Sequence, residues 1–233
     1  MRSGDTVYMA VQAGSGGSAI YWTSSSDGGA TWNNWLALPS SMSSVKPPSL
    51  ALVNGTLYLS YLGDGNNEIN ITALTDAATN SWSTQYQIPG QSATYASLTT
   101  ETVGTSQQLA VYCVSSDATN RILKAYTTNP GSSSNWTSDI QIQYSNNSGT
   151  QTASAPLAVS QLNGQTYLAY QGGTTGSPST EIYIATSTNT NTGSSWSAQG
   201  LLDPGVSTGW GSLAAATASR SATAPPAPPT ACN

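Results

Sequence analysis

The side chains of this chain that could do acid–base chemistry are few. Among 233 residues, 10 are Asp or Glu, 5 are Lys or Arg, and none is His. Without histidine a Ser-His-Asp relay is impossible, and a zinc site built on histidine is excluded. A glycosidase needs only two carboxyl groups about 5–10 Å apart. The carboxylates that could supply such a pair are Asp64, Glu68, Asp117 and Glu181. The sequence does not single out one pair among them.

A further acid lies in an unusual setting, the stretch SSDGGATW at positions 25–32. Asp27 is followed there by two glycines and, shortly after, by Trp32. Such a loop is suited to catalysis, to metal binding, or to a turn that only holds a fold together. The choice depends on the elements that surround it.

The composition favours strands and turns over helices. Charged residues make up only 6% of the chain, while Gly and Pro number 22 and 12. Helices usually carry Glu, Lys and Arg on their solvent faces, which this chain cannot furnish. Tyr, Thr, Val and Trp suit strands, and the glycines and prolines suit many turns.

The charge and hydropathy exclude two classes of partner. The net charge is −5, and five scattered cations cannot form the basic face that neutralises the phosphates of a nucleic acid. No apolar run approaches the roughly 20 residues of a membrane span. The polar, charge-poor composition resembles that of secreted microbial proteins, so we expect an extracellular location, although the opening MRSGDTVYMAV lacks the apolar core of a signal peptide. We expect Cys113 to be buried and free and Cys232 to dangle near the chain end.

A four-part pattern repeats about every 50–60 residues along the chain, and each copy contains a tryptophan. The tryptophans are Trp32, Trp82, Trp136 and Trp196. Two strand-like runs precede each tryptophan. The first runs are VYMAV (7–11), LYLSY (57–61), LAVY (109–112) and TYLAY (166–170). The second runs are IYWTS (20–24), INITA (69–73), ILKAYT (122–127) and IYIAT (182–186). Each tryptophan then begins a third run, and a fourth run follows it. The fourth runs are PSLALV (48–53), ASLTTE (96–101), APLAVS (155–160) and GSLAAA (211–216). Short apolar runs bounded by turn residues are the signature of strands.

Four short antiparallel strands per repeat describe the blade of a β-propeller. We therefore predict an all-β fold, a propeller of four four-stranded antiparallel blades that forms one domain over residues 1–218. The repeats span approximately 5–53, 54–101, 102–160 and 161–217. Because the chain opens on the second strand type and closes on the first, residues 211–216 could pair beside residues 7–11 and close the ring. The alternative is an open half-ring that pairs with another copy. The Pro/Ala-rich tail, 219–233, should be extended or disordered.

The stretch Ser25-x-Asp27-x-Gly29-x-Thr31-Trp32 resembles the Asp-box of BNR repeats, found in sialidase-like β-propellers. The match is full in the first repeat only. The resemblance implies a structural role: the Asp27 carboxylate accepts hydrogen bonds from the turn, glycine permits positive φ, and Trp32 packs beneath the hairpin. It also implies that the Asp-box lies on the face opposite the ligand pocket.

The resemblance does not extend to sialidase catalysis. That chemistry implies three arginines that clamp a carboxylate, and lysine does not replace the planar arginine fork. The chain has Arg2, Arg121 and Arg220, of which only Arg121 can reach the pocket side. We therefore predict that the chain is not an enzyme.

In a propeller, the loops between second and third strands share one face with the loops that lead into each first strand. The residues that we expect to bind a ligand on this face are Trp210, Tyr95, Asp64, Glu68, Asp117, Arg121, Tyr170 and Glu181. Aromatic rings stack on the apolar faces of sugars, while charged groups bond their hydroxyls, as a shallow sugar site requires. The simpler interpretation is that the acids are solvated and the tyrosines pack between blades. Within GDGNNE (63–68), acidic and amide side chains alternate as in a calcium loop, so calcium is possible, but no other cofactor is indicated.

Three functions remain open. The first is a non-catalytic lectin, whose repeated pockets would bind glycans with avidity. The second is a structural protein that assembles into a surface layer or filament, which allows a homo-oligomer. The third is a degenerate glycoside hydrolase.

Overall fold

The computed structural model describes residues 1–14, 16–143, 151–174, 177–197 and 200–201, and in this part the chain is all-β, with one 3₁₀ turn at Ser133–Asn135. The strands form three antiparallel sheets. The first sheet holds β1 (Arg2–Ser3), β2 (Thr6–Gln12), β3 (Ile20–Ser25) and β4 (Leu36–Ala37). The last sheet holds β13 (Ala158–Leu162), β14 (Gln165–Thr174), β15 (Ser177–Ser187) and β16 (Gly200–Leu201).

The middle sheet has eight strands and contains two copies of the repeat. Its strands are β5 (Ser49–Val53), β6 (Thr56–Leu62), β7 (Glu68–Asp76), β8 (Ser81–Trp82), β9 (Tyr86–Val103), β10 (Ser106–Ser115), β11 (Ile122–Thr127) and β12 (Ile140–Gln141). The long strand β9 joins the two copies, because its first part pairs with β7 and its second part pairs with β10. We call the four copies units 1 to 4: unit 1 holds β1–β4, unit 2 holds β5–β8 and the first part of β9, unit 3 holds the second part of β9 and β10–β12, and unit 4 holds β13–β16.

Tight turns explain why each unit begins with a hairpin. Asn54 and Gly55 separate β5 from β6, and both have positive φ, 49° and 81°. Asn163 and Gly164 do the same between β13 and β14. Asn-Gly is the pair that a two-residue hairpin turn favours, because its backbone twist matches that of the flanking strands.

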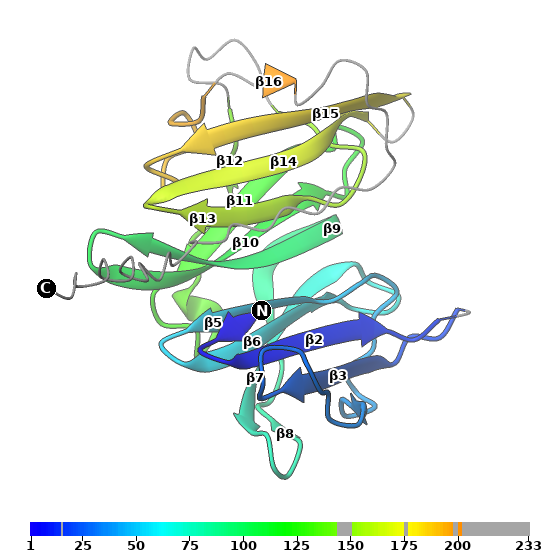
Figure 1. The fold of residues 1–233 in the computed structure, drawn as a ribbon. Helices are drawn as coiled ribbons and strands as arrows, with labels where there is room; N and C mark the ends of the chain where they lie inside the picture. Colours follow the sequence, from blue (N-terminus) through cyan, green and yellow to red (C-terminus); the bar gives the residue numbers. More distant parts are fainter. Residues whose placement is uncertain (15, 144–150, 175–176, 198–199, 202–233) are drawn as a thin grey trace, which may run out of the picture.

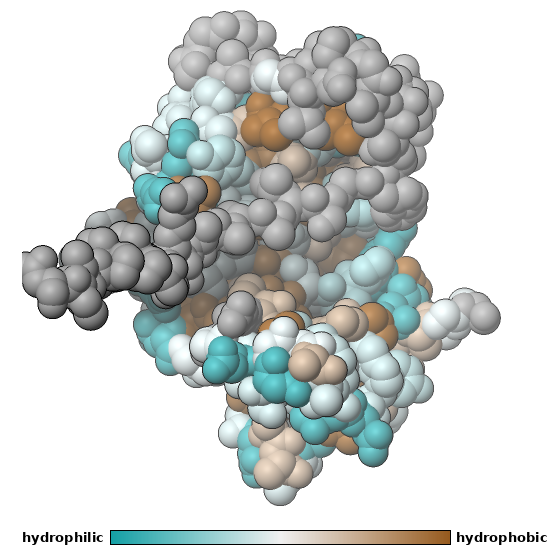
Figure 2. Space-filling view, in the orientation of Figure 1, coloured by the Kyte–Doolittle hydropathy of each residue, from teal (hydrophilic) through white to brown (hydrophobic). Residues whose placement is uncertain are grey.

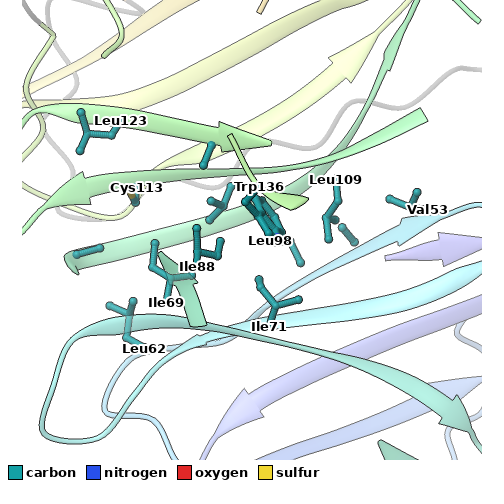
Figure 3. Packing of buried hydrophobic residues seen from close by; sticks show 14 residues of the cluster. Val53, Leu62, Ile69, Ile71, Ile88, Leu98, Leu109, Cys113, Leu123 and Trp136 are labelled. Carbon is teal, nitrogen blue, oxygen red and sulfur yellow. The ribbon is translucent and has the colours of Figure 1, made fainter. Parts of the chain in front are cut away.

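The core lies between neighbouring units. One cluster joins units 2 and 3 and includes Ile69, Ile71, Leu109 and Trp136; Figure 3 shows these side chains meeting between the two halves of the middle sheet. A second cluster joins units 3 and 4, and a third joins units 1 and 2. Neighbouring units therefore bury apolar side chains against one another along the chain.

The first and last sheets lie at opposite ends of the stack, with β2 and β3 at the bottom and β14 and β15 at the top of Figure 1. The ring is therefore not closed by these sheets, and the number of blades in a closed ring stays a prediction. The prediction that the chain opens on the second strand type is wrong. A short strand of the first type, β1, precedes β2 and pairs with it through Arg2–Val7 and Ser3–Thr6. The run 211–216, the tail 219–233 and Cys232 lie outside the described residues. No helix in the described part is long and apolar enough to cross a membrane.

Candidate functional site

The candidate site is a hollow where segments that lead into three first strands meet. Its volume is about 160 Å³. The lining residues are Lys46, Pro47, Pro48, Ser49, Tyr95, Ala96, Ser97, Pro156 and Leu157. In Figure 2, hydrophobic atoms gather in the depression across the middle of the molecule, between the level of β13 and that of β5. The sequence placed these segments together on one face, and the structure brings them together.

Lys46 and Tyr95 supply the chemistry of this central hollow. The Lys46 ammonium lies over the Tyr95 ring, 4.9 Å from its centroid, within the range of a cation–π contact. Arg121 and Lys124, by contrast, are each paired with a carboxylate. The Lys46 ammonium has three N–H groups that can donate to a ligand in the hollow.

A second hollow lies beside Glu68, at the start of β7. Gln87, Ile88, Pro89, Gly90 and Ser92 of β9 form the rest of its wall. Nδ2 of Asn66 donates to Oε2 of Glu68 at 2.8 Å, and the Glu68 N–H donates to Oδ1 of Asn66 at 3.1 Å. Asp64 is exposed in the same turn. In the described part of the chain, no cluster of three or more Asp, Glu, Cys or His side chains could hold a metal ion. The structure therefore gives no carboxylate cluster in support of calcium binding by the loop 63–68.

Asp117 and Arg121 are engaged with each other and with their own loop. Nη2 of Arg121 lies 2.6 Å from Oδ2 of Asp117. Oδ1 of Asp117 accepts hydrogen bonds from the Ser115 hydroxyl at 2.7 Å and from the Thr119 N–H at 3.0 Å. Hydrogen bonds from Thr119, Ser115 and Arg121 hold the pKa of Asp117 well below its usual range. The carboxylate therefore shapes the loop, and a ligand would compete with these donors.

Of the remaining predicted ligand-binding residues, Tyr170 and Glu181 do not line the central hollow. Tyr170 is 3% exposed and its ring stacks on that of Tyr183, with centroids 5.8 Å apart, so we remove it from the ligand-binding set. The Glu181 carboxylate accepts a hydrogen bond from the Tyr183 hydroxyl. Trp210 lies outside the described residues.

The Asp27 turn has the hydrogen bonds that the Asp-box resemblance implies. Oδ1 of Asp27 accepts from the Ser25 hydroxyl at 2.7 Å and from the Thr31 N–H at 2.9 Å, and Oδ2 accepts from the Thr31 hydroxyl at 2.6 Å. Gly29 has φ of +100° and donates its N–H to the Ser25 hydroxyl at 2.8 Å. Trp32 is 40% exposed and bonds Gly29 O at 3.1 Å, so it lies on the turn and is not packed beneath it.

We expect the Asp27 turn to make stability depend on acid pH. Hydrogen bonds from Thr31, and then from Ser25, hold the pKa of Asp27 far below its ordinary value of 3.8. The folded pKa is the lower one, so this stabilisation is present above pH 3.8 and is lost as pH falls toward the folded pKa. Asp27→Asn should therefore lower the melting temperature at pH 7, and the gap to the wild type should narrow as pH falls below 4 in thermal melts. A gap that stays constant from pH 7 to pH 2 would contradict this.

Lys46 is not among the site residues predicted from the sequence. The only signal in the sequence is its place in VKPPS (45–49). This loop leads into a first strand and lies on the face where the ligand-binding residues are predicted. A fully buried ion pair between Lys124 and Glu101 is also not predicted by the sequence; it lies between units 3 and 4, away from both hollows.

No protein-family model matches the chain, and no curated protein matches it in sequence. Solved structures do match its fold. An exo-β-1,3-galactanase from Phanerochaete chrysosporium, solved with galactose, has a TM-score of 0.60 at 14% identity, over 87% of this chain and 48% of the galactanase. An endo-arabinase from Bacteroides thetaiotaomicron has a TM-score of 0.58 at 13% identity, over 85% of this chain and 77% of the arabinase.

The NanB sialidase from Streptococcus pneumoniae is also similar, with a TM-score of 0.54 at 14% identity, over 74% of this chain and 26% of the sialidase. The chain spans about half the length of the galactanase chains it matches. At such identities the likeness establishes the fold: the chain resembles the β-propeller glycoside hydrolases, among them sialidase-like propellers.

These comparisons correct the prediction that the chain is not an enzyme, because the solved structures named here are all glycoside hydrolases. The prediction rested on the absence of a sialidase arginine clamp and of histidine. Hydrolysis of a glycosidic bond needs only a suitably spaced pair of carboxyl groups, so neither absence excludes it. The missing clamp therefore excludes one mechanism and not the whole class.

Proposed function

We propose that this chain is a carbohydrate-binding β-propeller whose central hollow, at Lys46 and Tyr95, binds a glycan outside the cell. The observation that carries the proposal is the Lys46 ammonium held 4.9 Å from the centroid of the Tyr95 ring, in a hollow otherwise walled by prolines, serines, an alanine and a leucine. The ring offers a flat apolar surface to a sugar face, and the ammonium and serine hydroxyls offer hydrogen bonds to sugar hydroxyls.

The fold adds independent support. The galactanase, the arabinase and the sialidase named above act on glycans, as their names say, and each shares this fold. A chain with few charges also suits an uncharged, hydroxyl-rich ligand, because serine and threonine side chains can exchange water for sugar hydroxyls at low desolvation cost. Binding alone would make the protein a lectin.

A second function, hydrolysis of the bound glycan, is favoured by the same comparisons. Glu68 lines the second hollow, and its neighbour Asp64 is exposed in the same turn. Two carboxyl groups of this kind are the minimum for the reaction. Turnover of fluorogenic galactosides, arabinosides and sialosides, lost in Glu68→Gln, would establish this function. Turnover unchanged in that variant would assign the reaction to other residues.

The binding proposal predicts that Tyr95→Ala weakens glycan binding at least tenfold, because the stacking surface is removed. A glycan array should first identify the ligand, and titration calorimetry should then compare the wild type with Tyr95→Ala and Lys46→Met. Trp35→Ala is the matched control, since it removes an aromatic side chain that is 48% exposed and does not line the hollow. The proposal fails if no glycan binds, or if the control loses as much affinity as Tyr95→Ala.

A further inference from the structure

The large apolar side chains that are exposed in the described part of the chain all lie in its first 45 residues. They are Met1, Met9, Val11, Trp32, Trp35, Leu36 and Val45, each 37–48% exposed. Large side chains of this kind elsewhere in the described part are buried or half-buried. Exposed apolar side chains that gather on one surface mark an interaction site, whereas singly scattered ones are normal.

The repeat shows that the positions of Met9 and Val11 are buried in the other units. Met9 pairs with Thr23 across the β2–β3 hairpin, as Leu59 pairs with Thr72 in unit 2. Val11 pairs with Tyr21, as Tyr61 pairs with Asn70. Met9 and Val11 are 41% and 37% exposed, whereas their equivalents Leu59 and Tyr61 are 0% and 2% exposed. By the same cross-strand pairing, the equivalent residues of the other two units are Val111, Cys113, Leu168 and Tyr170, which are between 0% and 3% exposed.

The tryptophans of the repeat follow the same rule. Trp82 makes an edge contact with Trp22 of unit 1, at 5.7 Å between centroids, and Trp196 makes one with Tyr112 of unit 3, at 5.8 Å. Nε1 of Trp136 lies 3.3 Å from the hydroxyl of Tyr86, on the strand that unit 2 shares. Each of these tryptophans thus packs on the preceding unit. Trp32, in unit 1, is 40% exposed and donates to Gly29 of its own turn.

We define the leading face as Met9, Val11, Tyr21 and Trp32 of unit 1. The surface that covers a leading face in the other units is the opposite, trailing face of the unit before. In unit 1 that trailing face includes Ile20 and Trp22, which are 1% and 2% exposed against unit 2. In unit 4 the trailing positions are Tyr167, Ile182 and Ile184, which are only half-buried. One chain therefore carries two faces that could pack on each other, the leading face of unit 1 and the trailing face of unit 4.

We propose that the leading face of unit 1 docks on the trailing face of unit 4 of a second copy of this chain. The two faces lie on sheets at opposite ends of the stack, so a second copy supplies the surface that each end lacks (Figure 1). The named residues of both faces are uncharged, so their burial costs no charge desolvation. The contact continues the packing already seen between units 1 and 2, 2 and 3, and 3 and 4. Because the two faces differ, the assembly is head-to-tail and forms rings or filaments.

The head-to-tail geometry gives a sharp test with two single variants of the full chain. Met9→Asp blocks the leading face and Ile184→Asp blocks the trailing face, while Thr188→Asp adds the same charge at an exposed position after β15. Sedimentation velocity over a range of concentrations should show multimers for the wild type and for Thr188→Asp, and monomers for each blocked variant. Each block should weaken association roughly 30-fold or more, as loss of a central apolar contact does. An equimolar mixture of the two blocked variants should form dimers and nothing larger, since one good leading face and one good trailing face remain.

Other outcomes overturn the proposal. If Ile184→Asp still forms dimers alone, the leading face pairs with itself. If the wild type is monomeric at every concentration while Met9→Asp lowers its melting temperature, the leading face is covered within one chain, as a closed ring requires. If Met9→Asp changes neither association nor melting, the face has no partner. Circular dichroism of each variant should confirm the strand content, so that a folding failure is not taken for a loss of contact.

Discussion

Lys124→Met is expected to lower the free energy of unfolding by about 3–5 kcal/mol, the loss typical when one partner of a buried ion pair is removed. Nζ of Lys124 lies 2.7 Å from Oε2 of Glu101, and both side chains are 0% exposed. Methionine matches the length of the lysine stem but leaves the carboxylate uncompensated in a site that water does not reach. Because burial lowers the pKa of Lys124 while Glu101 opposes that effect, the cation depends on this partner.

The rest of the cluster makes the loss hard to repair. Glu101 also accepts hydrogen bonds from the Tyr112 hydroxyl at 2.6 Å, from Gln108 Nε2 at 2.8 Å and from the Thr190 hydroxyl at 2.9 Å. These donors are neutral, so they orient the carboxylate without balancing its charge. Nζ of Lys124 donates in addition to Thr190 O at 3.0 Å. Since Thr190 follows β15, the cluster ties unit 3 to unit 4.

Urea unfolding monitored by tryptophan fluorescence measures this effect. Lys46→Met is the matched control, because Lys46 is only half-buried and the change should stay within about 0.5 kcal/mol. The double variant Lys124→Met with Glu101→Leu should recover part of the loss, as apolar replacements of buried pairs do. Full recovery is not expected, because Gln108 and Tyr112 lose their acceptor. A loss below 1 kcal/mol for Lys124→Met would show that the pair adds little to stability.

Local patterns were enough to predict the strands but not the way in which two units join. The run TLYLSYL (56–62) follows an Asn-Gly turn and forms β6, as alternation and turn chemistry predict. The segment IPGQS (88–92) contains Pro89 and Gly90, which normally end a strand. In the structure β9 continues through it, with Gly90 at φ of +70°, and pairs with β7 on one side and β10 on the other. Tertiary pairing therefore overrides the local signal.

For the site, the sequence predicted which loops share a face but not what each side chain contacts. Asp27 and Asp117 both follow a serine by two residues, and both carboxylates bond that serine and a nearby threonine. The resemblance to an Asp-box predicts a structural role in a turn for Asp27. The place of Asp117 on the loop face opposite the Asp-box predicts a ligand-binding role. The Glu101–Lys124 pair joins residues 23 positions apart on different strands, a contact that no local spacing encodes.

Trp196→Ala should cost about 3–5 kcal/mol, the range for removing a buried aromatic side chain from a core. Trp196 is 0% exposed and its ring meets Tyr112 edge-on between units 3 and 4. Among the tryptophans of the repeat, exposure rises from 0% for Trp196 through 8% for Trp136 to 40% for Trp32. The cost of alanine should fall in the same order, because a partly exposed side chain leaves a smaller cavity and loses fewer contacts.

Two further variants separate packing from hydrogen bonding in this series. Nε1 of Trp196 is buried without a hydrogen-bond partner among the described residues, whereas Nε1 of Trp136 lies 3.3 Å from the Tyr86 hydroxyl. Trp196→Phe therefore loses ring volume but no hydrogen bond, and Trp136→Phe loses both. Urea unfolding at low protein concentration should place Trp196→Ala as the largest loss and Trp32→Ala as the smallest. If Trp32→Ala costs as much as Trp196→Ala under those conditions, the leading face of unit 1 is covered within a single chain and not by a second copy.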